Sequence, residues 1–152
     1  MVIFAGMNTS DREIFSSRVL TVPVEAVYEA FANPAQLKEW WGPDGFTNTI
    51  HEFDLRPGGK WILTMHGPEA GNYENSSVFQ IVEPMKRVTW KRVSQPLFDM
   101  EVGFRKLDDS TTEISFRMMF ATAEECNKIR RFAGPKNEEN FDRLEKEIGA
   151  VR

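Results

Sequence analysis

The chain has 152 residues, of which 41% are hydrophobic and 28% are charged, and its net charge is −4. This composition is typical of a globular protein with one sizeable core, and it argues against an intrinsically disordered chain. The negative charge gives no general attraction to nucleic acid or to anionic membrane surfaces, so neither is expected as a partner.

Cysteine and histidine are scarce in this chain. A single cysteine, Cys126, excludes an internal disulfide, and with only His51 and His66 beside it there are too few ligands for a structural zinc site. No stretch approaches the roughly 18 consecutive apolar residues of a membrane-spanning helix, so membrane insertion is not expected. The opening "MVIFAGMN" is too short for a secretory signal and lacks a basic start. We therefore expect a cytoplasmic protein.

The first elements in chain order are a strand and two short helices. Residues 13–22 predict a strand, with Ile14, Ser16, Arg18 and Leu20 on one face. Residues 23–34 predict an amphipathic helix that begins at a proline and has apolar side chains three and four residues apart. A second short helix begins at Pro34, includes the tandem tryptophans Trp40 and Trp41, and ends where Gly42 and Pro43 cannot continue it.

The apolar pattern then changes to a period of two and keeps it for about half the chain. Short turn sequences such as "RPGG" at 56–59 and "LDDST" at 107–111 separate the alternating segments. Such segments are typical of antiparallel strands with one exposed face. Six strands are expected here, and the clearest alternation lies in "GGKWILTMHG", "YENSSVFQIVEP", "RVTWKRV", "LFDMEVGFRKLD" and "TTEISFRMMF".

Helical spacing returns after residue 121. Thr122 followed by Glu125 is a capping-box pattern, and the helix is expected to run to Ala133. Gly134-Pro135 follows, and because a proline costs about 3 kcal/mol inside a helix, we expect a break or kink there. The remaining residues 136–151 predict a further helical stretch with one apolar stripe, formed by Phe141, Leu144 and Ile148.

The order β-α-α-β(six)-α predicts one α+β domain over residues 1–152, with its core in 13–149. A long antiparallel sheet and a terminal helix must bury their apolar faces on each other. The sheet face that meets the helix either packs closely or leaves a pocket, and Asn75 and Ser77, in phase with apolar neighbours on that face, favour a pocket. The candidate ligand-binding residues are Trp41, Phe46, Trp61, Met65, Tyr73, Asn75, Ser77, Phe79, Trp90, Met100, Phe116 and Met118.

The sequence also resembles a known family. "TVPVEAVYEAFANPAQLKEWWGPDGFT", "EFDLRPGGKWILTMHGPEAGNY", "IVEPMKRVTWKR" and the later "FDRLEKEI" are similar to the bacterial relatives of the activator of heat-shock protein 90 ATPase, within the START-like, or SRPBCC, superfamily. The resemblance implies a helix-grip fold, in which a curved antiparallel sheet and two short helices wrap around a C-terminal helix. It also implies a cavity, which in many members holds lipids, sterols, polyketides or plant hormones.

Three functions follow from these observations. The first is non-catalytic binding of a small apolar or aromatic molecule in the cavity between the sheet and the C-terminal helix. The alternative implied by the resemblance is a co-chaperone-like protein that modulates a heat-shock protein 90 type ATPase. A cavity enzyme of the cyclase or hydrolase type is the second alternative, with His66, Tyr73, Glu74 and Asn75 as its candidate participants.

No cofactor is expected. The residues offer no transition-metal site, and the glycine pair of "RPGG" precedes a strand, whereas a phosphate-binding loop precedes a helix. No sequence pattern here predicts the oligomeric state.

Overall fold

The structure is a computed structural model that describes residues 11–151. The opening segment at residues 1–8, expected to be no secretory signal, lies outside the described residues. The helices and strands, in chain order, are β1 (Glu13–Leu20), α1 (Val24–Ala32), α2 (Pro34–Trp40), β2 (Thr47–Phe53), β3 (Lys60–His66), β4 (Asn72–Glu83), β5 (Arg87–Arg92), β6 (Asp99–Asp108), β7 (Thr111–Met119) and α3 (Ala123–Val151).

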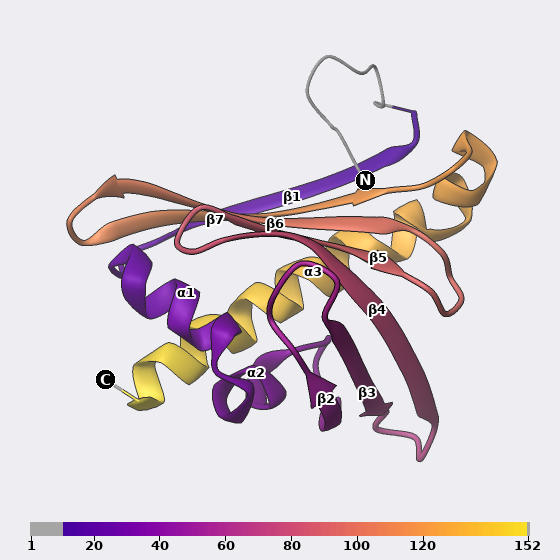
Figure 1. Ribbon diagram of the computed structural model, residues 1–152, viewed down its shortest axis with the longest axis horizontal. Helices are drawn as coiled ribbons and strands as arrows, with labels where there is room; N and C mark the ends of the chain where they lie inside the picture. The colour runs from indigo at the N-terminus through magenta and orange to yellow at the C-terminus, as the bar shows by residue number, and fades with distance from the viewer. Residues whose placement is uncertain (1–10, 152) are drawn as a thin grey trace.

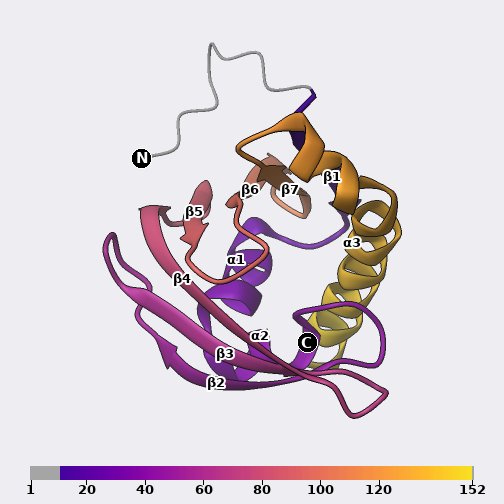
Figure 2. The ribbon, with the colours of Figure 1, turned by 90° about the vertical axis from the view of Figure 1, so that its right-hand side faces the viewer.

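The strands form one antiparallel sheet in the order β1-β7-β6-β5-β4-β3-β2, with β1 and β2 at its edges. The sheet curves around the three helices, and α3 lies along its concave side (Figure 1, Figure 2). This is the helix-grip arrangement that the sequence predicts, including the order of its elements. Strand β2 at 47–53 completes the six strands expected after the two short helices, and it is the first of them in chain order.

Side chains on the concave face follow the predicted alternation. Met100, Val102 and Phe104 of β6 are buried, and so are Ile114, Phe116 and Met118 of the neighbouring β7, whereas the intervening side chains are more exposed. The same alternation buries Ile14, Ser16 and Leu20 of β1. A period-two pattern therefore predicted correctly which face of the sheet is covered.

Aromatic rings fill much of the concave side. Phe31 of α1 lies among Trp41, Trp61 and Trp90, with ring centroids 5.7 to 6.3 Å apart. Trp61 stacks on Phe79 at 6.2 Å and meets Trp90 edge to face at 5.1 Å. Burying a side chain of this size contributes about 1.5–3 kcal/mol, so these rings are a main source of stability.

Of the two outcomes expected at Gly134-Pro135, a break or a kink, the break is wrong. Helix α3 continues from Ala123 to Val151 with Pro135 inside it, although Figure 2 shows that its first turns lie at an angle to the remainder. Pro135 and Arg131 are exposed, so water can reach the Arg131 carbonyl that loses its helical partner. The predicted cap is present, because the Glu125 amide donates to Thr122 Oγ1 at 3.1 Å.

A charge cluster fixes α3 along β1. The Arg18 guanidinium donates to Glu138 at 2.9 Å, Asp142 at 2.6 Å and Glu145 at 2.8 Å, three carboxylates on successive turns of the helix. Burial by itself would lower the pKa of Arg18, but the three hydrogen bonds together outweigh it and raise the pKa. The charged residues of α3 that face β1 therefore position the helix across the sheet.

The tandem tryptophans have different roles. Trp40 is fully buried and its indole Nε1 donates to the Ala30 carbonyl at 2.8 Å, which joins α2 to α1. Trp41 lies just beyond the helix in extended conformation and turns its ring toward Trp61, at 5.1 Å, and Trp90. Gly42 then takes a φ of +98°, a conformation that favours glycine and lets the chain leave α2.

Candidate functional site

A cavity of about 100 Å³ lies between the concave face of the sheet and α3. Its lining combines large apolar side chains with one guanidinium and two amides. The lining residues are Trp41, Trp90, Arg92, Phe98, Met100, Phe116, Met118, Asn137 and Asn140. An apolar hollow with a few polar groups has the composition of a ligand site, although its volume is below the roughly 300–1,000 Å³ of typical small-molecule pockets.

The structure brings part of the predicted residue set to this cavity. Trp41, Trp90, Met100, Phe116 and Met118 line it. The others lie elsewhere in the domain.

Trp61 and Phe79 are packed in the aromatic cluster, and Ser77 is buried beside them on the same face of β4. Phe46 and Tyr73 lie near each other away from the cavity, with ring centroids 6.0 Å apart and Tyr73 55% exposed. Met65 packs against Gly42 in the loop after α2.

Four lining residues were absent from the predicted set: Arg92, Phe98, Asn137 and Asn140. Arg92 continues the alternation of Val88 and Trp90, so a charge in phase with buried apolar residues was the available signal. The two asparagines lie three residues apart on α3, which puts them on the same side of the helix. Asn140 donates to the Trp40 carbonyl at 2.7 Å, and Asn137 donates to Ser16 Oγ at 3.2 Å.

Arg92 is the charged group of the cavity. Its guanidinium donates to Asn75 Oδ1 at 2.5 Å, to the carbonyls of Pro96 at 2.8 Å and Gln95 at 3.1 Å, and to Ser94 Oγ at 3.4 Å. All four acceptors are neutral, and within residues 11–151 Arg92 forms no ion pair. Burial lowers the pKa of Arg92 to about 10, because the surroundings do not compensate for the water that the cation has lost.

Asn75 is occupied by protein partners. Its Oδ1 accepts from Arg92, and its Nδ2 donates to the Tyr73 carbonyl at 3.0 Å. The polar atom on this face that was expected to orient a ligand therefore holds Arg92 in place instead. Arg92, Asn137 and Asn140 are the polar residues that line the hollow.

A second, larger hollow of about 490 Å³ adjoins the cavity at the ends of β5, β6 and β7. Arg92 and Phe98 line both spaces, with the guanidinium carbon 5.2 Å from the centre of the Phe98 ring. The cation–π pair thus forms the partition between the inner cavity and this outer pocket. The remaining walls of the outer pocket are Arg12, Lys91, Val93, Leu97, Asp99, Met119, Phe120 and Ala121.

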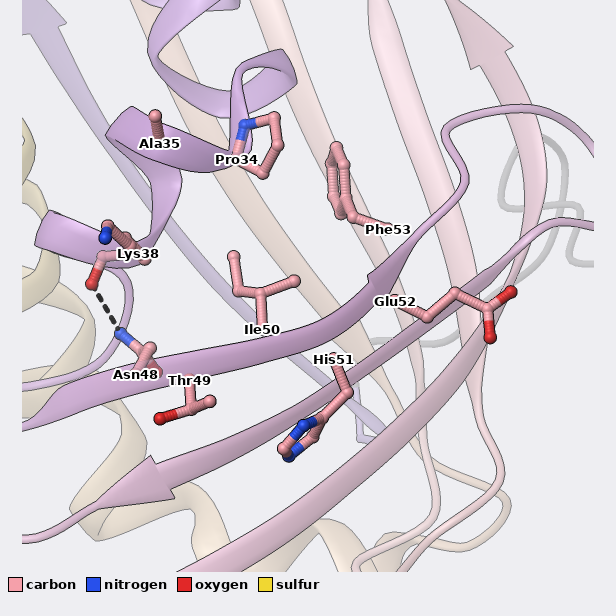
Figure 3. A pocket seen from close by; sticks show the side chains of 9 residues that line it. All are labelled: Pro34, Ala35, Lys38, Asn48, Thr49, Ile50, His51, Glu52 and Phe53. Atoms are coloured by element: carbon pink, nitrogen blue, oxygen red, sulfur yellow. Dashed lines mark hydrogen bonds between the residues drawn. The ribbon is translucent and has the colours of Figure 1, made fainter.

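A groove of about 550 Å³ runs between α2 and the edge strand β2 (Figure 3). Ile50 and Phe53 point toward Pro34 and Ala35 of α2, and Asn48 donates to the Lys38 carbonyl at 3.0 Å. His51 points away from α2. The groove is open along its length, and its polar side chains do not converge on one point, so it is the weaker candidate for a small ligand.

The four residues considered for cavity catalysis are not brought together. His66 lies 2.7 Å from Asn72 Oδ1 and 2.8 Å from Thr49 Oγ1, and Glu74 accepts from Thr64 at 2.7 Å. These contacts are on the convex face, since strand alternation directs Thr64, His66 and Glu74 away from the buried Trp61 and Leu63. Asn75 faces inward and Tyr73 is exposed at the end of the sheet.

No group of three or more His, Cys, Asp or Glu side chains in 11–151 is arranged to hold a metal ion. None of the helices within the same range is long and apolar enough to cross a membrane.

Solved structures share this fold. A protein from Nitrosomonas europaea is 21% identical, with a TM-score of 0.84 over 94% of this chain and 97% of that one. A protein from Rhodobacter sphaeroides is 20% identical, with a TM-score of 0.83 over 96% and 98% of the two chains. The AHSA1 protein from Silicibacter pomeroyi is 18% identical, with a TM-score of 0.73 over 92% and 99%. At these identities the likeness establishes the fold alone. A search of curated proteins gave no match.

A family model supplies the sequence-level relationship. The family described as "Activator of Hsp90 ATPase homolog 1-like protein" matches residues 21–149. That span contains both short helices, the tandem tryptophans, every residue that lines the inner cavity, and nearly all of α3. The chain therefore belongs to the Activator of Hsp90 ATPase homolog 1-like family.

Proposed function

We propose that this protein binds a small, mainly apolar or aromatic molecule between the concave face of the sheet and α3, without catalysing its conversion. The observation that carries the proposal is the inner cavity, where Trp41, Trp90, Phe116 and two methionines surround a few polar groups. Methionine side chains adapt to different ligand shapes, because they are unbranched and flexible. The adjoining outer pocket of about 490 Å³ adds the volume that the inner cavity lacks.

A ligand screen tests this proposal. Binding should raise the melting temperature, because a ligand that binds only the folded state stabilises it by mass action. It should also change tryptophan emission, since Trp41 and Trp90 line the cavity. The screen should contain apolar and aromatic compounds with neutral and charged head groups.

Two matched substitutions locate the site. Met118→Phe adds volume to the wall of the inner cavity, and Ile50→Phe adds volume to the groove beside β2. We expect Met118→Phe to weaken binding at least tenfold and Ile50→Phe to leave it unchanged. The reverse result would move the site to the groove, and a screen in which no compound stabilises the wild-type protein would refute the proposal.

The description of the family suggests a second candidate function, which is modulation of an Hsp90-type ATPase. It is tested by adding the purified protein to a purified Hsp90-type chaperone and measuring ATP hydrolysis. A concentration-dependent, saturable change in the hydrolysis rate would support this candidate. Ile50→Phe and Met118→Phe then report whether the groove or the cavity contributes to the effect.

A further inference from the structure

We propose that the ligand of this protein carries a carboxylate, that Arg92 binds this carboxylate in the inner cavity, and that the apolar part of the ligand lies in the outer pocket. This inference rests on the proposed function and specifies the chemical class of the ligand. It follows from the hydrogen bonding of Arg92, the charges around the outer pocket, and the sizes of the two spaces.

The hydrogen bonds of Arg92 leave room for an anion. A guanidinium has five N–H donors, and the four contacts of Arg92 all go to neutral oxygens. Hydrogen bonds from a guanidinium to a carboxylate are shorter and roughly twice as strong as those between neutral groups. A carboxylate that replaced Asn75 as the acceptor would therefore gain interaction strength and supply the missing counter-charge. The lowered pKa of Arg92 agrees with a cation that has been removed from water without being paired.

The outer pocket has an excess of positive charge. Among its described lining residues Arg12, Lys91 and Arg92 are cationic, and Asp99 is acidic. Burial raises the pKa of Asp99. A net positive pocket on a chain with a net charge of −4 is a local feature that attracts anions against the overall charge.

The two volumes suit different parts of one ligand. The inner cavity of about 100 Å³ holds a few non-hydrogen atoms, which fits a compact planar head group but no complete ligand. The outer pocket of about 490 Å³ presents Val93, Leu97 and Phe120, and of these Val93 and Leu97 are about half exposed. A ligand that spans both spaces must displace the Phe98 ring from Arg92, so this pair would open when the ligand enters.

The test uses pairs of compounds that differ only in charge: benzoate and benzamide, 2-naphthoate and 2-naphthamide, decanoate and decanamide. Dissociation constants are measured at pH 7 by calorimetry and by tryptophan emission. We expect at least one acid to bind ten times or more tightly than its amide. Arg92→Gln should remove this preference, and Arg92→Lys should retain part of it because the charge remains.

Lys60→Gln is the matched control, because it removes the same charge from an exposed position on β3 that lines neither the inner cavity nor the outer pocket. It should keep the preference for the acid, and each variant's melting temperature confirms that it folds. If amides bind as tightly as acids, or if Arg92→Gln keeps the preference, the carboxylate inference is wrong while the binding function stands. If no compound of either series binds, both proposals fail.

Discussion

Helix α3 contacts its surroundings in different ways at its C-terminal end and at its middle, and two arginines show the difference. Near the C-terminal end, Arg143 donates to five main-chain carbonyls at 2.7 to 3.2 Å, those of Glu39, Trp41, Gly42, Pro43 and Phe46. Arg92, across the inner cavity from Asn137 and Asn140 in the middle of the helix, has four neutral acceptors and faces a hollow. Burial lowers the pKa of both groups.

This difference shows that a partly buried arginine without a carboxylate partner can have either of two roles. It can hold the main chain in place, as Arg143 does, or it can lie beside a hollow, as the proposed binding residue Arg92 does. Arg143 donates to carbonyls of the loop after α2 that would otherwise be buried without a hydrogen-bond donor. It therefore holds this loop against the C-terminal end of α3. Arg92 is held by a surface loop and by Asn75, and it lies where the sheet and helix do not fill the space between them. The C-terminal end is closed by Arg143, whereas a hollow remains beside Arg92.

The largest expected effect on stability comes from replacing Arg143. Arg143→Met should lower the free energy of unfolding by about 2–4 kcal/mol, because several partly buried carbonyls lose their donor. Arg92→Met should change it by less, about 1 kcal/mol. Water can reach the loop carbonyls and the cost of burying the charge disappears, which offsets the loss of the donor to the buried Asn75 Oδ1. Urea unfolding measures both. Equal losses would mean that Arg92 is also a structural anchor.

The tandem tryptophans offer a second comparison. Trp40→Phe should cost about 2–3 kcal/mol, since it creates a void in the core and leaves the Ala30 carbonyl without its donor. Trp41→Phe should cost less, because Trp41 is only partly buried and borders a cavity, and it should reduce the ligand-dependent change in emission. Unfolding curves and fluorescence titrations report the two effects. A ligand response lost in Trp40→Phe but kept in Trp41→Phe would contradict the assignment.

Gly134 and Pro135 are expected to lower the stability of α3. Pro135→Ala should raise the free energy of unfolding by about 1–3 kcal/mol, because it restores a helical hydrogen bond to Arg131 and removes the ring from the helix. Gly134→Ala, where an added Cβ meets no atom within 4 Å, should give up to about 1 kcal/mol. Urea unfolding measures both variants. A Pro135→Ala protein less stable than wild type would show that the bent helix is required for packing.

The fold and the inward faces of the strands could be predicted from the sequence, because a period of two fixes which side chains face the core. The fate of Pro135 could not be predicted, because its cost depends on whether the affected carbonyl meets water. The lining of the candidate cavity was predicted only in part. Trp41 and Met118 were found as large apolar residues, but Arg92 was missed because a charge at the end of a strand usually marks solvent. The size of the cavity depends on how the rings of Trp41, Trp61 and Trp90 pack, and residue types do not encode that.

The smallest expected effect is on pH dependence. The pKa of Arg92 is lowered to about 10, and a carboxylic acid titrates near 4, so acid binding should be level between pH 6 and 8. Above about pH 10 affinity should fall, because Arg92 loses its proton and its charge. The titration is best made in the Lys91→Gln protein, from which the neighbouring positive charge of the outer pocket has been removed. Affinity that stays level up to pH 11 would contradict an ion pair with Arg92.

The most direct measurement is NMR of the four tryptophan indole N–H groups and the Arg92 and Arg143 Nε–H groups during titration with the tightest-binding acid. The account predicts that Trp41, Trp90 and Arg92 shift most, since all three line the inner cavity, while Trp40 and Arg143 at the closed end stay nearly constant. Shifts centred on Trp40 and Arg143, or confined to the backbone of β2 beside the groove, would contradict it.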